Sequence, residues 1–401
     1  MWQEGQGGGR VLLGPGFLGG WRRPAGLLDV LRLTHEDLAG TDLVGALRSL
    51  LAGVPHGGVL AGYLGYEAAL AIPPLGELAG VLPRPASVDG AALPAAWAGA
   101  FARHEAAVPP PPGPVPTPSR LSGEGAGDPR ARFEAAVAET RRAILDGALF
   151  QANLSRPLRA RWDERPDAAA LFGRLAAGTH APYAALIEVA EGAVLSASPE
   201  LFFAAEGDRV RAEPVKGTKP RGATPEADRA LAAALLASDK DRAENVMIAD
   251  LMRNDLSRVA VDGTVAEEAV CALRSAPGVH HLHSQISARL RPGLDALDVL
   301  AAAYPCGSIT GAPKRAAMER IAQAEAEGRG PYCGAVFAVT PGGRAVFSVA
   351  IRTGALTWAG EGARLEVRTG GGVTALSDPA EEHEETVTKA YPFTLMTGLA
   401  P

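Results

Sequence analysis

The segment Glu213-Pro-Val-Lys-Gly-Thr-Lys-Pro-Arg-Gly222 places Lys216 between two prolines, in what the sequence predicts to be a turn. Gly217, directly after the lysine, lets the backbone approach a ligand because it has no Cβ atom. A lysine in this setting can be a solvated surface charge, a contact for an anion or, if its pKa is lowered, a nucleophile. The segment alone leaves all three interpretations open.

Carboxylates on two predicted helices are candidate metal ligands. Glu244 is followed four and seven residues later by apolar side chains, so its carboxylate lies on an otherwise apolar face. Glu382 and Glu385 share a face of the last predicted helix, and Lys389 follows four residues after Glu385. Carboxylates from separate elements suit Mg²⁺, which prefers oxygen ligands and keeps part of its water shell. The alternative, favoured by spacing alone, is a charged helix surface with a Glu–Lys pair.

Two glycine-rich segments are predicted turns whose backbone N–H groups can bind a carboxylate or a phosphate. The first is Gly307-Ser-Ile-Thr-Gly-Ala-Pro-Lys314, which contains Thr310, and the second is Gly370-Gly371-Gly372. Neither matches the P-loop or the dinucleotide-binding fingerprint. A plain turn without a ligand is the alternative at both places.

Further polar residues stand at the ends of predicted strands or within them. Glu200 follows Ser198-Pro199, where partial burial would keep its carboxyl group protonated. Arg352 ends an apolar strand, a natural place for a carboxylate clamp. In His280-His281-Leu-His283 neighbouring side chains face opposite sides of a strand, which favours one functional histidine over a metal site.

Composition limits the classes of partner. The 401 residues include 39 basic and 45 acidic side chains, a net charge of −6, which argues against nucleic acid or an anionic membrane as the main partner. Three cysteines are too few for a disulfide framework and lack metal spacing, which fits a reducing cytoplasm. We expect no signal peptide and no membrane-spanning segment, because no apolar run is long enough.

The chain divides at a proline-rich stretch. Residues 109–118 contain seven prolines, and a Gly-rich stretch extends this predicted linker to residue 128. Residues 1–108 carry few distinct motifs and are expected to contribute to the same αβ sandwich, whereas residues 129–401 carry nearly all the chemistry.

Helices and hairpins alternate irregularly in the second part, which predicts an α+β fold rather than regular βαβ units. Capping and periodicity predict helices over residues 130–147, from Thr224, over 238–254, over 307–326 and from Asp378. Strands are predicted over residues 183–189, 193–197, 335–340, 345–351 and 365–369.

Taken together, the motifs resemble those of the chorismate-utilising enzymes, and most closely the aminodeoxychorismate synthase component I branch. The resemblance covers about residues 130–395 in family order, whereas residues 1–110 match poorly and Cys306 stands where the family often has glycine. The segments that carry it are Phe150-Gln-Ala-Asn-Leu-Ser155, Ser196-Ala-Ser-Pro-Glu-Leu-Phe202, Pro214–Gly222, Lys240-Asp-Arg-Ala-Glu-Asn245, Asp250–Asp255, His281, Gly307–Lys314, Gly330-Pro-Tyr-Cys-Gly334, Ile351-Arg-Thr353, Gly370–Gly372 and Glu382-His-Glu-Glu-Thr386.

The resemblance implies two opposed antiparallel sheets wrapped by helices, with the active site between them. It implies Mg²⁺ held by Glu244 and Glu385, with Glu382 close by, and bound to the ring carboxylate of chorismate. Further residues match positions that contact the substrate: Tyr332 and Arg352 at the enolpyruvyl carboxylate, Gly370, Gly371, Gly372, Thr310 and Lys389 around the ring carboxylate, and His281 near the ring.

Lys216 distinguishes the branches, because anthranilate and isochorismate synthases typically have another residue there. In the aminodeoxychorismate branch the lysine is thought to add to ring C2 while the C4 hydroxyl leaves, after which ammonia attacks C4 and expels the lysine. Glu200 matches the acid that protonates the departing hydroxyl. The expected product is 4-amino-4-deoxychorismate, for 4-aminobenzoate and folate synthesis.

No glutaminase nucleophile motif is recognisable in the chain. We therefore expect ammonia from a separate glutamine amidotransferase subunit, and an aminodeoxychorismate lyase as the next enzyme. The alternatives are an anthranilate synthase, an isochorismate or salicylate synthase, an aminodeoxychorismate enzyme of antibiotic synthesis, and a catalytically inactive chorismate-binding subunit.

Overall fold

The computed structural model describes residues 9–73, 75–84, 92–120, 128–276 and 279–401. Within these ranges the strands are β1 (Arg10–Leu13), β2 (Arg22–Leu33), β3 (Val59–Leu64), β4 (Ala96–Ala106), β5 (Ser119–Arg120), β6 (Gln151–Trp162), β7 (Tyr183–Val189), β8 (Gly192–Ser198), β9 (Leu201–Glu206), β10 (Arg209–Glu213), β11 (Val215–Pro220), β12 (Ala266–Ala276), β13 (Val279–Arg289), β14 (Gly311–Ala312), β15 (Ala335–Val339), β16 (Arg344–Val349), β17 (Thr353–Ala359) and β18 (Gly362–Val373).

The helices are α1 (Pro15–Leu18), α2 (Leu43–Ala52), α3 (Pro129–Leu145), α4 (Ala168–Thr179), α5 (Pro225–Leu236), α6 (Asp239–Ser257), α7 (Ala296–Ala303), α8 (Lys314–Ala324), α9 (Pro379–Lys389) and α10 (Tyr391–Thr397), with 3₁₀ turns η1 (Tyr66–Ala71), η2 (Leu75–Gly80) and η3 (Gly307–Ile309). Several begin where the sequence predicts, because a side chain caps the first turn. Thr224, Ser238 and Asp378 each accept a hydrogen bond from a backbone N–H of the helix that follows.

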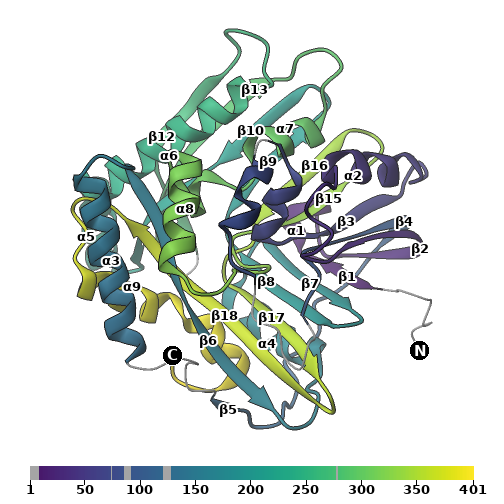
Figure 1. Cartoon of the computed structure of the whole chain (residues 1–401), viewed down its shortest axis with the longest axis horizontal. Helices are drawn as coiled ribbons and strands as arrows, with labels where there is room; N and C mark the ends of the chain where they lie inside the picture. Colours follow the sequence, from purple (N-terminus) through teal and green to yellow (C-terminus); the bar gives the residue numbers. More distant parts are fainter. Residues whose placement is uncertain (1–8, 74, 85–91, 121–127, 277–278) are drawn as a thin grey trace.

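The eighteen described strands form one continuous antiparallel network that folds into two opposed layers (Figure 1). The core between the layers joins β7 and β8, with Ile187 and Val194, to β3, β4 and β15, with Tyr63, Trp97 and Val336. All these side chains are almost completely buried. The predicted α+β class with two opposed antiparallel layers is therefore confirmed.

Helices cover the outer face of each layer. On one side Leu47 of α2, Ile248 of α6 and Leu300 of α7 pack with Phe203 and Phe337 of the sheet. On the other side α4 and α10 pack against β6, β8, β17 and β18. Helices α3 and α9 lie side by side (Figure 1). The helix predicted over 307–326 begins later than expected, at Lys314, because residues 307–309 form the 3₁₀ turn η3.

Residues 1–108 contribute strands to both layers. Strand β3 pairs with β15, and β1 pairs with β7, so strands from the beginning of the chain complete the sheets of the rest. The proline-rich stretch 109–118 contains no helix or strand. It packs against the second part, where Trp162 Nε1 donates a hydrogen bond to the Pro116 carbonyl at 2.8 Å.

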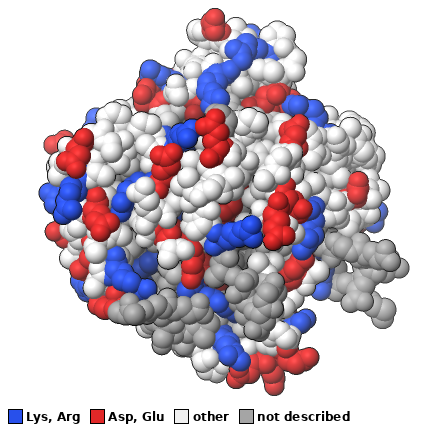
Figure 2. All heavy atoms as spheres, viewed as in Figure 1, with Lys and Arg blue, Asp and Glu red and all other residues white. Residues whose placement is uncertain are grey.

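Charges on the molecular surface are mixed. On the face shown in Figure 2, acidic and basic side chains alternate without a large patch of either sign. None of the described helices is long and apolar enough to span a bilayer.

Candidate active site

Lys216 lies on a strand, so the predicted turn at this segment is wrong. Strand β11 pairs with β13, and the register shifts between Lys216 and Thr218. The extra residue is Gly217, which has φ +78°; a Cβ atom there would lie 3.0 Å from the Cβ of Asp241 on α6. A bulge at a glycine of positive φ lets β11 run close against α6 and changes the direction of the neighbouring side chains.

Ser308 connects Lys216 with Glu200. Lys216 Nζ donates a hydrogen bond to the Ser308 carbonyl at 2.8 Å. Burial raises the pKa of Glu200, and the Ser308 hydroxyl and the Lys216 charge offset this only in part. Within the described residues, Glu200 Oε1 has no hydrogen-bond partner. A buried carboxyl group of this kind holds its proton to higher pH and can act as an acid.

The three predicted metal-binding carboxylates come together. Burial raises the pKa of Glu244, the charges of Lys216 and Lys240 lower it, and Glu385 and Glu382 raise it again. Burial also raises the pKa of Glu382, although Ser377 donates a hydrogen bond to it at 2.7 Å. The three carboxylates are therefore close enough to shift one another's pKa values, although α6 and α9 are far apart in sequence.

Lys389 holds Glu385 in this cluster. Its Nζ atom donates to Glu385 Oε1 at 2.5 Å and to the Gly370 carbonyl at 3.2 Å. Burial alone would raise the pKa of Glu385, but the charge and hydrogen bond of Lys389, together with the charges of Lys240 and Lys216, outweigh it and lower the pKa. Glu385 is thus the carboxylate that keeps its negative charge most readily.

Gly370, Gly371 and Gly372 belong to strand β18, so the predicted turn is wrong here as well. They pair with Ser155, Leu154 and Asn153 of β6, and none of the three has positive φ. Glycine is required because neighbours are close: a Cβ on Gly370 would lie 2.1 Å from the Leu154 carbonyl oxygen, and one on Gly372 would lie 2.1 Å from Gln151 Nε2.

The glycine strand also forms the wall of the carboxylate cluster. A Cβ atom on Gly371 would lie 3.0 Å from Glu382 Oε2 and 3.1 Å from Glu385 Oε1, so both carboxylates face the same small space. In the described part of the chain no three His, Cys, Asp or Glu side chains are arranged as a ready-made metal site. The donor chemistry nevertheless fits a hard cation such as Mg²⁺, because the carboxylates of Glu382 and Glu385 that border this space offer oxygen ligands.

Arg352 and Tyr332 lie on neighbouring segments. The backbone N–H of Cys333 donates to the Ala350 carbonyl at 2.9 Å, which brings the Tyr332 loop beside the segment that leads to Arg352. The Arg352 guanidinium lies 5.4 Å from the ring centroid of Tyr391. Arg352 and Cys333 have φ of 53° and 64°, a conformation that residues other than glycine rarely adopt and that often occurs at functional sites.

Thr310 is fully buried, and its hydroxyl group donates to the Cys306 carbonyl at 2.9 Å. Its own carbonyl accepts from the backbone N–H of Asn153 at 2.8 Å. The turn that carries Thr310 and Ser308 is thereby attached to β6, whose residue Asn153 pairs with Gly372. Cys306 is buried in the same turn, with Sγ 3.3 Å from the Ser308 hydroxyl.

Sequence reasoning missed two contributors to this site. Lys240, whose Nζ lies 3.4 Å from Glu382 Oε1, stands four residues before Glu244, and that helical spacing could have identified it. Ser308 has no comparable sequence signal, because its contact with Lys216 joins segments 92 residues apart.

His281 provides a pH test of this geometry. Its Nδ1 atom lies 2.9 Å from the Thr218 hydroxyl, and burial, with a smaller effect of the Arg352 charge, lowers its pKa to about 4. Between about pH 6.5 and 4 the unfolded chain therefore binds a proton on this ring that the folded chain does not. We expect the free energy of unfolding to fall as pH is lowered through this window. Above the window the His281 ring is neutral in both states and does not change the free energy of unfolding with pH.

The measurement is urea unfolding at several pH values, with His281→Gln as the comparison. The variant should have a shallower fall in the free energy of unfolding across the window, and NMR of the His281 ring should show no titration between about pH 5.5 and 8. A ring that titrates near pH 6.5 in the folded protein would contradict the burial described here.

Comparison with known sequences identifies the family of this chain. The family described as "chorismate binding enzyme" matches residues 29–395. Aminodeoxychorismate synthase component 1 of Salmonella typhimurium is 42% identical over 246 residues, which are 61% of this chain and 53% of that protein. An anthranilate synthase component 1 of Haloarcula marismortui is also 42% identical, over 65% of this chain and 52% of its own length. The match thus spans about half the length of these curated relatives.

Solved structures show the same fold. Anthranilate synthase component I from Streptococcus pneumoniae superposes with a TM-score of 0.75 at 22% identity, over 99% of this chain and 94% of that one. The menaquinone-specific isochorismate synthase of Escherichia coli gives 0.71 at 16% identity, over 98% and 89%. With the family match over most of its length and the carboxylates, lysine and arginine assembled as described, this chain belongs to the chorismate binding enzyme family.

Proposed function

We propose that this chain is an aminodeoxychorismate synthase component I, which converts chorismate and ammonia to 4-amino-4-deoxychorismate. One observation carries the proposal: the charge of Lys216 acts both on the buried acid Glu200 and on the carboxylates Glu244 and Glu385. A lysine between a proton donor and a cation site is placed where a covalent nucleophile could reach a ligand bound there.

In the first step the lone pair of the Lys216 amine forms a bond to ring C2 of chorismate. Both ring double bonds shift along the conjugated system and the C4–O bond breaks, while Glu200 gives its proton to the departing hydroxyl group, which leaves as water. In the second step ammonia forms a bond to C4, both double bonds shift back, and the C2–N bond breaks with its electron pair returning to Lys216. The extra proton on the new amine returns to Glu200, so the acid is restored.

Glu244, Glu382 and Glu385 would hold the Mg²⁺ ion, which when bound would offset part of the negative charge of the ring carboxylate and the three glutamates. Lys389 fixes Glu385 beside the glycine strand. Arg352 and Tyr332 would bind the enolpyruvyl carboxylate, and His281, neutral at physiological pH, would lie near the ring.

The proposal includes a partner subunit. The relatives named component 1 imply a second component in those proteins, and no glutaminase nucleophile motif is recognisable in this chain. We propose that a separate amidotransferase supplies ammonia in the cytoplasm and that aminodeoxychorismate lyase receives the product. Anthranilate synthase is the second candidate, because such relatives are equally similar.

Product analysis separates the two candidates. The purified chain, incubated with chorismate, Mg²⁺ and ammonium at alkaline pH, should yield 4-amino-4-deoxychorismate by mass spectrometry and NMR. Adding aminodeoxychorismate lyase should then release 4-aminobenzoate, and glutamine should replace ammonium only when an amidotransferase is added. Direct formation of 2-aminobenzoate or of isochorismate would overturn the assignment in favour of the corresponding synthase.

Glu385→Gln tests the metal site. The change keeps the shape of the side chain and removes its charge, so we expect turnover to fall at least about tenfold and half-saturation by Mg²⁺ to rise. Glu384→Gln is the matched control, because Glu384 is the adjacent acid on α9 and its side chain is 59% exposed beside Arg130. Full activity in EDTA, or equal effects of both changes, would exclude this cation site.

Lys216→Ala tests the covalent step. We expect kcat to fall at least about a hundredfold while the KM for chorismate changes little, because the carboxylate contacts remain. Lys216→Arg should not restore activity, since guanidinium is almost never deprotonated. Lys219→Ala, on the same strand, is the control.

Intact-protein mass spectrometry without ammonia should detect an adduct of the wild-type chain and none of the Lys216→Ala variant. If the Lys216→Ala variant keeps a kcat near that of the wild type and forms the same product, Lys216 is only an electrostatic contact and the covalent step is excluded.

A further inference from the structure

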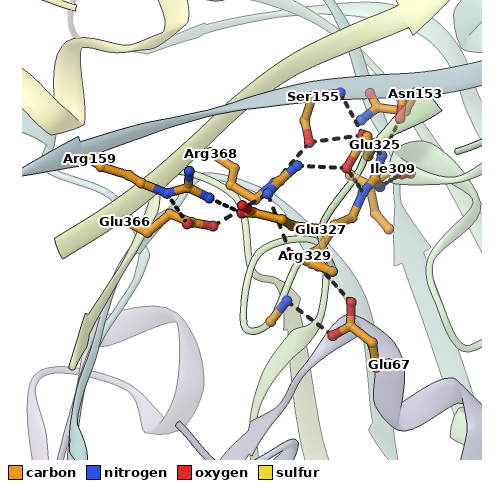
Figure 3. A network of polar contacts seen from close by, with 12 residues as sticks. Glu67, Asn153, Ser155, Arg159, Ile309, Glu325, Glu327, Arg329, Glu366 and Arg368 are labelled. Atoms are coloured by element: carbon orange, nitrogen blue, oxygen red, sulfur yellow. Dashed lines mark hydrogen bonds and ion pairs between the residues drawn. The ribbon is translucent and has the colours of Figure 1, made fainter. Parts of the chain in front are cut away.

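Glu67 links the N-terminal part of the chain to the loop that carries Tyr332. It lies on η1 and is 2% exposed. Its Oε1 atom accepts a hydrogen bond from the backbone N–H of Arg329 at 2.6 Å, and Oε2 accepts one from Gly330 at 3.0 Å (Figure 3). The backbone N–H of Tyr66 donates to the Gly330 carbonyl at 2.8 Å. Three hydrogen bonds therefore attach η1 to two consecutive residues of the loop.

The side chain of Arg329 extends this attachment into the substrate site. Nη1 donates to the Ile309 carbonyl at 3.0 Å, and Nη2 donates to the Asn153 carbonyl (Figure 3). Ile309 precedes Thr310, and Asn153 pairs with Gly372. The guanidinium lies 4.8 Å from the ring centroid of Tyr66 and 6.0 Å from that of Tyr332. One buried cation thus contacts the two segments that carry the predicted substrate contacts Thr310 and Tyr332, and also strand β6, which pairs with Gly372.

The loop has an unusual backbone conformation. Gly330 and Cys333 have φ of 57° and 64°, on either side of Tyr332. The loop also borders a cavity of about 40 Å³ that Arg329, Gly330 and Pro331 help to line. A non-glycine residue in this conformation persists only where its surroundings determine it. The two bonds from the Glu67 carboxylate hold the first two residues of this loop and contribute to that constraint.

We infer that Glu67 is a positioning residue for the substrate site: its carboxylate fixes the loop 329–333, and with it the Tyr332 ring at the enolpyruvyl end of the ligand. This inference rests on the proposed function, in which chorismate is the ligand. It assigns a role to the N-terminal part of the chain, which contributes no predicted substrate contact of its own.

The chemistry of Glu67 explains why a carboxylate is needed. Both of its oxygens accept from backbone N–H donors. Glutamine has the same shape but only one acceptor oxygen, and its amide group would face a second donor. Glu67→Gln therefore removes one buried hydrogen bond and sets two donors against each other, without opening a cavity.

The experiment compares steady-state kinetics and amide hydrogen exchange of the wild type and Glu67→Gln. We expect the KM for chorismate to rise about tenfold, the scale of one lost hydrogen bond to a charged group, with kcat within about threefold of the wild-type value. Exchange should become faster in residues 329–333 and stay unchanged in β18. Glu67→Asp, which keeps the charge, should give an intermediate KM.

The matched control is Glu327→Gln. Glu327 belongs to the same ionic network and binds Arg159 (Figure 3), but within the described ranges its side chain makes no hydrogen bond or ion pair with residues 329–333. The Glu327→Gln change should leave the KM for chorismate unchanged. Four outcomes would overturn the inference. The KM could shift equally in Glu67→Gln and Glu327→Gln, or stay unchanged in Glu67→Gln. Glu67→Gln could instead lose activity only in kcat, or both Glu67 variants could misfold. If the wild-type chain does not convert chorismate, the proposed function fails, and hydrogen exchange of residues 329–333 still decides whether Glu67 holds the loop.

Discussion

Arg329 carries a full positive charge in the interior, 1% exposed, and the arrangement of the site follows from the need to satisfy it. An unpaired buried charge costs several kcal/mol, so Glu325 and the carbonyls of Ile309 and Asn153 must lie where they meet the guanidinium. Burial would lower the pKa of Arg329, but Glu325 outweighs it and keeps the cation charged. Because each acceptor belongs to a different segment, pairing one charge sets the relative positions of all three.

The candidate active site shows the opposite balance, with several acidic groups buried close together. Burial dominates at Glu200 and Glu244 and raises their pKa values, whereas the lysines around Glu385 lower its pKa. Carboxyl groups whose environments separate their pKa values can take different roles, one as a proton donor and another as an anionic ligand. Lys216 belongs to both environments. In the proposed reaction the same electrostatic field would serve proton transfer at one end and cation binding at the other.

Local features were predictable from the sequence and long-range ones were not. Helices α5, α6 and α9 begin at the predicted caps because a cap acts within three residues of itself. The turns predicted at Lys216 and at Gly370–Gly372 were wrong, because glycine there permits a bulge or a close neighbour rather than a chain reversal. Glu67 and Arg329 are 262 residues apart, and no local pattern predicts that they meet. The metal, substrate and catalytic roles of the site residues stay predictions.

The fold itself does not determine the reaction. Relatives named aminodeoxychorismate synthase and anthranilate synthase are equally similar to this chain, so most of the shared sequence serves what both require. The glycine strand, the glutamates of α6 and α9 and the Arg329 network can hold the same carboxylated ring in either case. We expect the residues that distinguish the two reactions to act at the ring carbons themselves. In this chain the bulge at Gly217 directs a lysine towards a buried acid, and a primary amine at that point offers a nucleophile where water or ammonia would otherwise have to enter. If the proposed function is correct, the choice of reaction depends on one side chain and the bulge beside it, and the rest of the fold serves either reaction.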